Sequence, residues 1–109
     1  MARFISLDAV SEDTEGSVLK LVGENNTAHS MQVILTGSPT AAIVQLQGAL
    51  DPIDPTWFSI AEFSIAAGDA TGAIKNVSAC PVMALRAVLT GLTGGTSPTV
   101  TALVQTARV

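Results

Sequence analysis

Short aliphatic segments, interrupted by clusters of Gly, Pro, Asn and Asp, follow one another along most of this chain. The segments are rich in Val, Ile, Leu and Thr, and turn signals recur at intervals of about 8 to 12 residues, as in sandwiches and barrels. This pattern predicts about seven strands, at residues 17–22, 28–35, 42–50, 57–65, 73–77, 82–90 and 99–107.

Alternation of apolar and polar residues supports several of these strands, because neighbouring side chains in a strand point to opposite faces. Met31, Val33 and Leu35 share one face of the second predicted strand. Gln45 and Gln47 lie opposite the aliphatic residues of the third. The pattern therefore predicts strands that bury one face and expose the other.

The turns indicate how the strands are connected. The sequence Thr-Gly-Ser-Pro at 36–39 predicts a short hairpin between the second and third strands, because Gly tolerates positive φ and Pro presets the bend. We expect these two strands to pair. Ser-Pro-Thr occurs at both 38–40 and 97–99, which indicates shared turn chemistry.

The segment 79–92 is rich in Ala, Met and Leu, which would also suit a helix. Pro81 at its start and the alternation around Arg86 favour a strand. We therefore expect an all-β chain.

The chain's 109 residues fit one domain. Residues 1–16 are expected to form either an N-terminal arm or a first strand followed by an acidic loop, and residues 17–109 a single antiparallel β-sandwich. Jelly-roll and immunoglobulin-like connections both remain open, because they produce similar patterns along a sequence.

Charge is scarce in this sequence. Charged residues make up 13% of the chain, against about 25% in an average soluble domain. Such a surface suits a protein covered by copies of itself or by a partner, although a surface of Thr, Ser, Gln and Ala is an equal alternative. The net charge of −4 and the scattered Lys and Arg residues argue against nucleic acid as a partner.

No secretory signal or membrane span is expected. Residues 1–7 are followed at once by Asp8 and further acids, and the apolar runs are shorter than the roughly 20 residues that a spanning helix needs. We expect a protein made in the cytoplasm.

Few residues offer catalytic or metal-binding chemistry. His29 is the sole histidine and is expected to be structural, and Cys80 is the sole cysteine and is expected in the core. One of each cannot build a zinc site. Asp51 and Asp54 could contribute to a calcium site, but turn formation beside proline explains both. No cofactor and no metal are expected.

A glycosidase would need two carboxylates beside a sugar cleft, and Glu62 with Asp69 is the one plausible pair. The chain has no tyrosine and one tryptophan, so it offers little aromatic platform for a sugar. We expect both acids to be solvated, and the protein not to be an enzyme.

Exposed apolar residues are the best candidates for an interface. Trp57 and Phe58 are adjacent and must face opposite ways in a strand. We expect Trp57 to be the largest side chain of the core, with an interface anchor as the alternative. The candidate interface residues are Arg3, Phe4, Ile5, Leu7, Trp57 and Phe58.

A succession of segments between residues 44 and 104 resembles one known group of proteins. The segments are VQLQGALD at 44–51, Trp57, AGDATG at 67–72, PVMALRA at 81–87 and LTGGTSPTVT at 92–101. Their order and spacing resemble small β-sandwich virion proteins of tailed bacteriophages, which include head decoration (cement) proteins and tail-associated modules. Ala84 and Leu85 precede Arg86 where that group commonly has a tyrosine, so no ligand site is carried over.

The resemblance implies a structural protein present in many copies, often trimeric, whose partner is the major capsid protein or another virion protein. We expect a capsid decoration protein located in the virion. A tail or head-tail subunit and a carbohydrate-binding module are the alternatives. Phe4, Ile5 and Leu7 could let the N-terminal segment augment a neighbouring sheet.

Overall fold

A computed structural model describes residues 2–21, 27–51, 53–64, 72–78 and 80–107. Within these residues the chain forms nine strands and no helix. The strands are β1 (Ala2–Val10), β2 (Thr14–Glu15), β3 (Leu19–Lys20), β4 (Ala28–Thr36), β5 (Ala41–Ala49), β6 (Phe58–Ser64), β7 (Gly72–Val77), β8 (Ala84–Thr93) and β9 (Thr99–Ala107). The predicted all-β class is confirmed, and the segment that also suited a helix contains β8.

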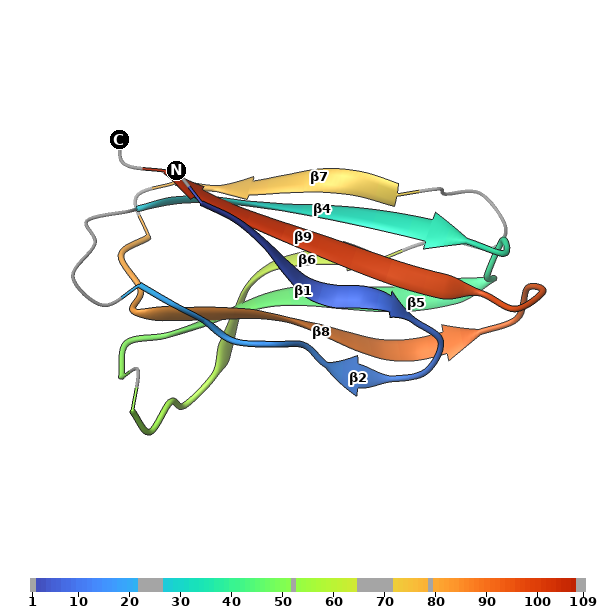
Figure 1. The fold of residues 1–109 in the computed structure, drawn as a ribbon, viewed down its shortest axis with the longest axis horizontal. Coiled ribbons are helices and arrows are strands. Elements are labelled where there is room, and N and C mark those ends of the chain that lie inside the picture. The colour runs from blue at the N-terminus through green and yellow to red at the C-terminus, as the bar shows by residue number, and fades with distance from the viewer. Residues whose placement is uncertain (1, 22–26, 52, 65–71, 79, 108–109) are drawn as a thin grey trace.

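The strands form two antiparallel sheets packed face to face (Figure 1). The first sheet has the order β1-β9-β4-β7, and the second has the order β2-β8-β5-β6, with β3 also paired to β8. We name them sheet A and sheet B. Strands at equivalent positions in the two orders are neighbours along the chain, as in β1 and β2 or β4 and β5. This is the order of a jelly roll, one of the two connections that the sequence left open.

The predicted sandwich therefore exists, with two more strands among the described residues than expected. One addition is β1, and the other arises because β2 and β3 together occupy one edge position beside β8. The predicted strand at 17–22 is reduced to Leu19–Lys20 in this arrangement.

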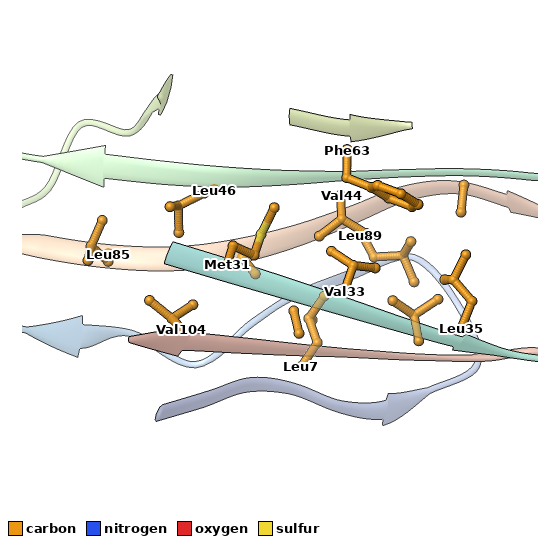
Figure 2. Close-up of a cluster of buried hydrophobic side chains, with 14 of the residues drawn as sticks. Leu7, Met31, Val33, Leu35, Val44, Leu46, Phe63, Leu85, Leu89 and Val104 are labelled. Carbon is orange, nitrogen blue, oxygen red and sulfur yellow. The ribbon is translucent and has the colours of Figure 1, made fainter. Parts of the chain in front are cut away.

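Aliphatic side chains from both sheets fill the space between them (Figure 2). In β4, buried Met31, Val33 and Leu35 alternate with exposed Gln32 and Ile34, as the sequence predicts. The core residues below 2% exposure in sheet B include Val44, Leu46, Leu85 and Leu89. Burying one face of each sheet is the main apolar contribution to stability.

The predicted hairpin between β4 and β5 is wrong. β4 pairs with β7 and β9 in sheet A, whereas β5 pairs with β6 and β8 in sheet B. The turn at 37–40 thus carries the chain from one sheet to the other. Gly and Pro indicate that the chain reverses, but they do not distinguish edge-to-edge pairing from face-to-face packing.

The β8–β9 connection crosses between the sheets beside the β4–β5 connection, at one end of the molecule (Figure 1). The Thr96 amide donates to the Gly37 carbonyl at 2.9 Å. Ser38 and Ser97 each precede a proline and have positive φ values of 50° and 46°. The repeated Ser-Pro-Thr therefore marks two adjacent crossings in which the serine has a positive φ.

Residues 2–10 form a strand paired with β9, so of the two alternatives for the N-terminal segment the structure has the strand. The register shifts at Ser6, whose side chain turns inward and is 5% exposed. The Ser6 hydroxyl donates to the Ser17 carbonyl at 2.8 Å and accepts from the Ala87 amide at 2.9 Å. These bonds join the edge of sheet A to β8 of sheet B.

Gly16 completes this junction, since its amide donates to the Ala87 carbonyl at 2.7 Å. A Cβ at Gly16 would lie 2.4 Å from the Ser6 hydroxyl and 2.6 Å from the Ala87 carbonyl oxygen. We therefore expect Gly16→Ala to lower the free energy of unfolding by about 1–3 kcal/mol, measured by urea denaturation. Ser17→Ala, next to it and exposed, should change it by less than about 0.5 kcal/mol. Equal stability of the two variants would contradict this account.

Candidate functional site

The sequence-predicted interface residues fall in two separate places. On β1, Ile5 is 44% exposed and lies opposite Leu103, Phe4 is half-buried, and Leu7 is fully buried in the core. Leu7 is therefore not available to a partner. The Arg3 backbone pairs with Gln105, and its side chain lies outside the described part of the chain.

Trp57 and Phe58 are the other two predicted interface residues. They lie where the chain enters β6. A register shift occurs here, because Ala61 pairs with Leu46 but Ser59 pairs with Gln47. Ile60 between them is an extra, bulged residue, which reverses the alternation of faces. Phe58 pairs with Gly48 and so lies on the inner side of sheet B. It lies at the end of the sheet, outside the core, and 69% of its surface is exposed.

The expectation that Trp57 fills the core is wrong. Trp57 is half-buried, and the Arg86 guanidinium carbon lies 4.5 Å from its ring centroid. Phe63, 4% exposed, is the aromatic residue of the core instead. The bulge explains the error, because strict alternation from Phe63 places Trp57 on the buried face.

Arg86 is the centre of a polar network on the outer face of sheet B. Its Nε donates to the Gln47 amide oxygen at 2.9 Å, and its guanidinium lies 3.4 Å from the Glu15 carboxylate. Gln47 donates to Gln45 at 3.2 Å, and Gln45 donates to Glu62 at 3.1 Å. The network crosses β2, β8, β5 and β6, so it links every strand position of the sheet.

This network leaves the outer face of sheet B polar and already hydrogen-bonded. Arg86 is 16% exposed and Glu15 is 71% exposed, so the ion pair itself contributes less than about 1 kcal/mol. Stacking on Trp57 and the bond to Gln47 add further support to Arg86. The sequence placed Arg86 on an outward face but could not give its partners, because they depend on strand register.

The outer face of sheet A has a different character. One row of paired residues across its four strands consists of Ile5, Leu103, Gln32 and Ile74. Ile5 and Ile74 are 44% and 58% exposed, and Ile34 in the next row is 39% exposed. The outward positions of β9, β4 and β7 are otherwise Ser, Thr, Gln, Asn, Gly and Ala. Along these three strands the outer face carries no charged side chain.

A pocket of about 420 Å³ lies where β5 ends and β6 begins. Its residues come from the end of β5, the β5–β6 loop, the start of β6 and the segment before β8. They are Gly48, Ala49, Leu50, Asp51, Asp54, Thr56, Phe58, Ile60 and Val82. Most of the lining is apolar, and the two carboxylates come from the loop.

Asp51 organises this loop. Its Oδ1 accepts the backbone amides of Ile53 at 2.9 Å and Asp54 at 3.2 Å. These two hydrogen bonds stabilise the carboxylate and hold the pKa of Asp51 below its usual range. The turn-forming role predicted for Asp51 is thus present, and among the described residues no group of three or more His, Cys, Asp and Glu side chains is placed to hold a metal ion.

The remaining candidate residues have structural surroundings. His29 is 1% exposed, and its Nε2 lies 2.8 Å from the Cys80 carbonyl oxygen, as suits the structural role predicted for it. Cys80 is half-buried and lies outside the core cluster, so its predicted core position is wrong. Glu62 is exposed on β6, and Asp69 lies outside the described residues. No helix in the described part of the chain could cross a membrane.

Trp57 is the only tryptophan of the chain, so its fluorescence reports directly on the Arg86 contact. We expect Arg86→Lys to shift the emission to longer wavelength and to lower the free energy of unfolding by about 1–2 kcal/mol, because lysine keeps the charge but loses the planar stack and the fork of donors. Lys20→Ala, on exposed β3, should change neither quantity. Unchanged emission and stability in Arg86→Lys would refute the importance of this network.

No family model matches the chain, and no curated protein matches its sequence. Among solved structures, the chain is similar to the crystal structure of SPBc2 prophage-derived protein YomS. That match covers 94% of this chain and 90% of the other, with a TM-score of 0.55 and 14% sequence identity. The similarity extends over nearly the whole sandwich, and at this identity it establishes the fold alone.

Proposed function

We propose that this chain is a non-enzymatic bacteriophage structural protein, and specifically a capsid decoration protein that binds and stabilises the assembled head. The observation that carries the proposal is the outer face of β9, β4 and β7 in sheet A, which carries no charged side chain and exposes Ile34 and Ile74, with Ile5 exposed on the adjoining β1. Exposed apolar residues gathered on one surface are typical of protein contacts. The protein would be made in the host cytoplasm and reside in the virion.

Two lines of similarity support a phage origin. Viral capsid domains are among the proteins built on jelly rolls, although a fold by itself does not determine function. The solved structure that resembles this chain is named as prophage-derived. The succession of segments between residues 44 and 104 resembles phage virion proteins independently of the fold.

The face of sheet A suits docking better than its β7 edge does. Lys75 on edge strand β7 pairs with Met31, so its side chain starts from the inner side of the sheet. An inward-pointing charge on an edge strand discourages pairing with another chain. Docking on the outer face, where Gln32 and Ile74 lie next to each other, avoids this charge.

Binding to the assembled head would stabilise it by mass action, because the protein would recognise neighbouring capsid subunits only when they are in place. We propose a homo-oligomer, with a trimer favoured, whose copies present this face to the major capsid protein. A tail or head-tail subunit would use the same face against a different virion protein.

The test is co-sedimentation with undecorated capsids, using two variants matched in exposure. Ile34 is 39% exposed on the outer face of sheet A, and Ile43 is 38% exposed on the outer face of sheet B. We expect the native protein and Ile43→Lys to pellet with capsids, and Ile34→Lys to bind at least about 10-fold more weakly, because lysine places an uncompensated charge in the contact.

Light scattering on the same samples gives the oligomeric state. Binding of the native protein to tails but not to capsids would favour the tail subunit. Failure to bind either particle, or equal loss in both variants, would refute docking through sheet A. A carbohydrate-binding module is the alternative from another class, favoured by the exposed Phe58, and hits on a glycan array would support it.

A further inference from the structure

We propose that the pocket at the β5–β6 end of the sandwich binds a basic side chain of a protein partner, with arginine preferred over lysine. The pocket combines an apolar floor, an exposed aromatic ring and two carboxylates. It lies on the inner side and end of sheet B, so it is separate from the outer face of sheet A.

The backbone of β5 and β6 creates the pocket. Gly48 has no side chain, and a Cβ there would lie 3.0 Å from Val82 and 3.5 Å from Ile60. The bulge at Ile60 turns Phe58 to the inner side of the sheet, opposite this glycine. A volume of about 420 Å³ therefore remains between these residues and the loop, within the roughly 300–1,000 Å³ of typical ligand pockets.

The charges around the pocket have one sign. Asp51 uses Oδ1 for the loop amides, and within the described residues no hydrogen bond or ion pair engages the carboxylate of Asp54. Arg86, the cation of the neighbouring strand β8, is already paired with Glu15. The pocket thus presents two carboxylates without a described cation, and a basic group complements it.

The same molecule holds an arginine in a closely similar setting. On the opposite side of the chain, Arg86 stacks on Trp57 at 4.5 Å and approaches the Glu15 carboxylate at 3.4 Å. Phe58 follows Trp57 in the chain. Its exposed ring lines the pocket together with Asp51 and Asp54. Each site therefore has its own aromatic ring and its own carboxylate oxygens. Among the described residues, only the site at Trp57 contains a cation.

Arginine fits this combination better than the alternatives. Its methylene stem can pack on the apolar floor while its planar guanidinium stacks on Phe58 and donates to Asp54. Lysine satisfies the charge but stacks less well on a ring. A neutral sugar would use the ring and the acceptors but would leave the two negative charges without a counterion.

The probe is the peptide acetyl-Gly-Arg-Gly-amide, added to ¹⁵N-labelled protein and followed by NMR. We expect its amide shifts to centre on Gly48, Phe58 and Val82, with weaker binding by the matching lysine peptide. Affinity should fall as salt rises from about 10 mM to about 150 mM, because the Debye length shortens from about 30 Å to about 8 Å. The glutamine peptide should produce no such shifts.

Single substitutions separate the contributions. Asp54→Asn and Phe58→Leu should each weaken arginine binding by about 3- to 10-fold, since each removes one part of the recognition. Glu62→Gln is the matched control, because it removes an exposed carboxylate from β6 but not from the pocket, and its affinity should equal that of the native protein.

The proposal is overturned if the arginine and glutamine peptides shift the pocket equally, if neither shifts it, or if glucose shifts it and the arginine peptide does not. It stands apart from the proposed docking face. Asp54→Asn should still co-sediment if docking uses sheet A, and Ile34→Lys should still bind the arginine peptide.

Discussion

Hydrophobic contact between the inner faces of the two sheets determines which surfaces of this protein remain exposed. Leu46 and Leu89 of sheet B meet Met31 and Val104 of sheet A in a core that excludes water. Most consecutive strands lie in opposite sheets and therefore have lateral neighbours from distant parts of the chain, whereas β2 and β3 share one sheet and β5 pairs directly with β6. The two outer faces and the ends of the sandwich are the surfaces left for function.

The side chains of the two outer faces differ in character. On the outer face of sheet B, Arg86, Gln45 and Gln47 form hydrogen bonds with one another. Sheet A has no comparable network of charges and exposes isoleucine among short polar residues. A protein with a net charge of −4 can approach a partner most easily through β9, β4 and β7, whose outer face carries no charged side chain. This asymmetry, together with the jelly-roll fold, underlies the proposed function.

Local signals in the sequence predicted the strands and the core but not the strand neighbours. Periodicity identified the buried face of β4 because Met31, Val33 and Leu35 share one side of the strand, although Ile34 is an apolar exception on the other. The β4–β5 turn was misassigned because turn chemistry is the same whether strands pair or cross between sheets. Trp57 was misassigned because one bulged residue, Ile60, reverses the faces before it. Burial at Ser6 is equally invisible in the sequence, since the partner that requires it, Ala87, is far along the chain.

The candidate surfaces, like the strands, could be predicted only where they depend on local sequence. Ile5 and Phe58 were recognisable as exposed apolar candidates, whereas the partners of Arg86 and the pocket around Gly48 required the register of β5, β6 and β8. A feature that depends on one strand could be predicted, and a feature assembled from several strands could not.

Hydrogen exchange of the protein mixed with the capsids that it is proposed to bind tests the central claim most directly. If the outer face of sheet A is the docking surface, exchange should slow most along edge strand β7, with Ile74 at its centre, while edge strand β6 of sheet B keeps the rate of the unbound protein. Slowed exchange confined to β6 and the strands beside it would contradict the account.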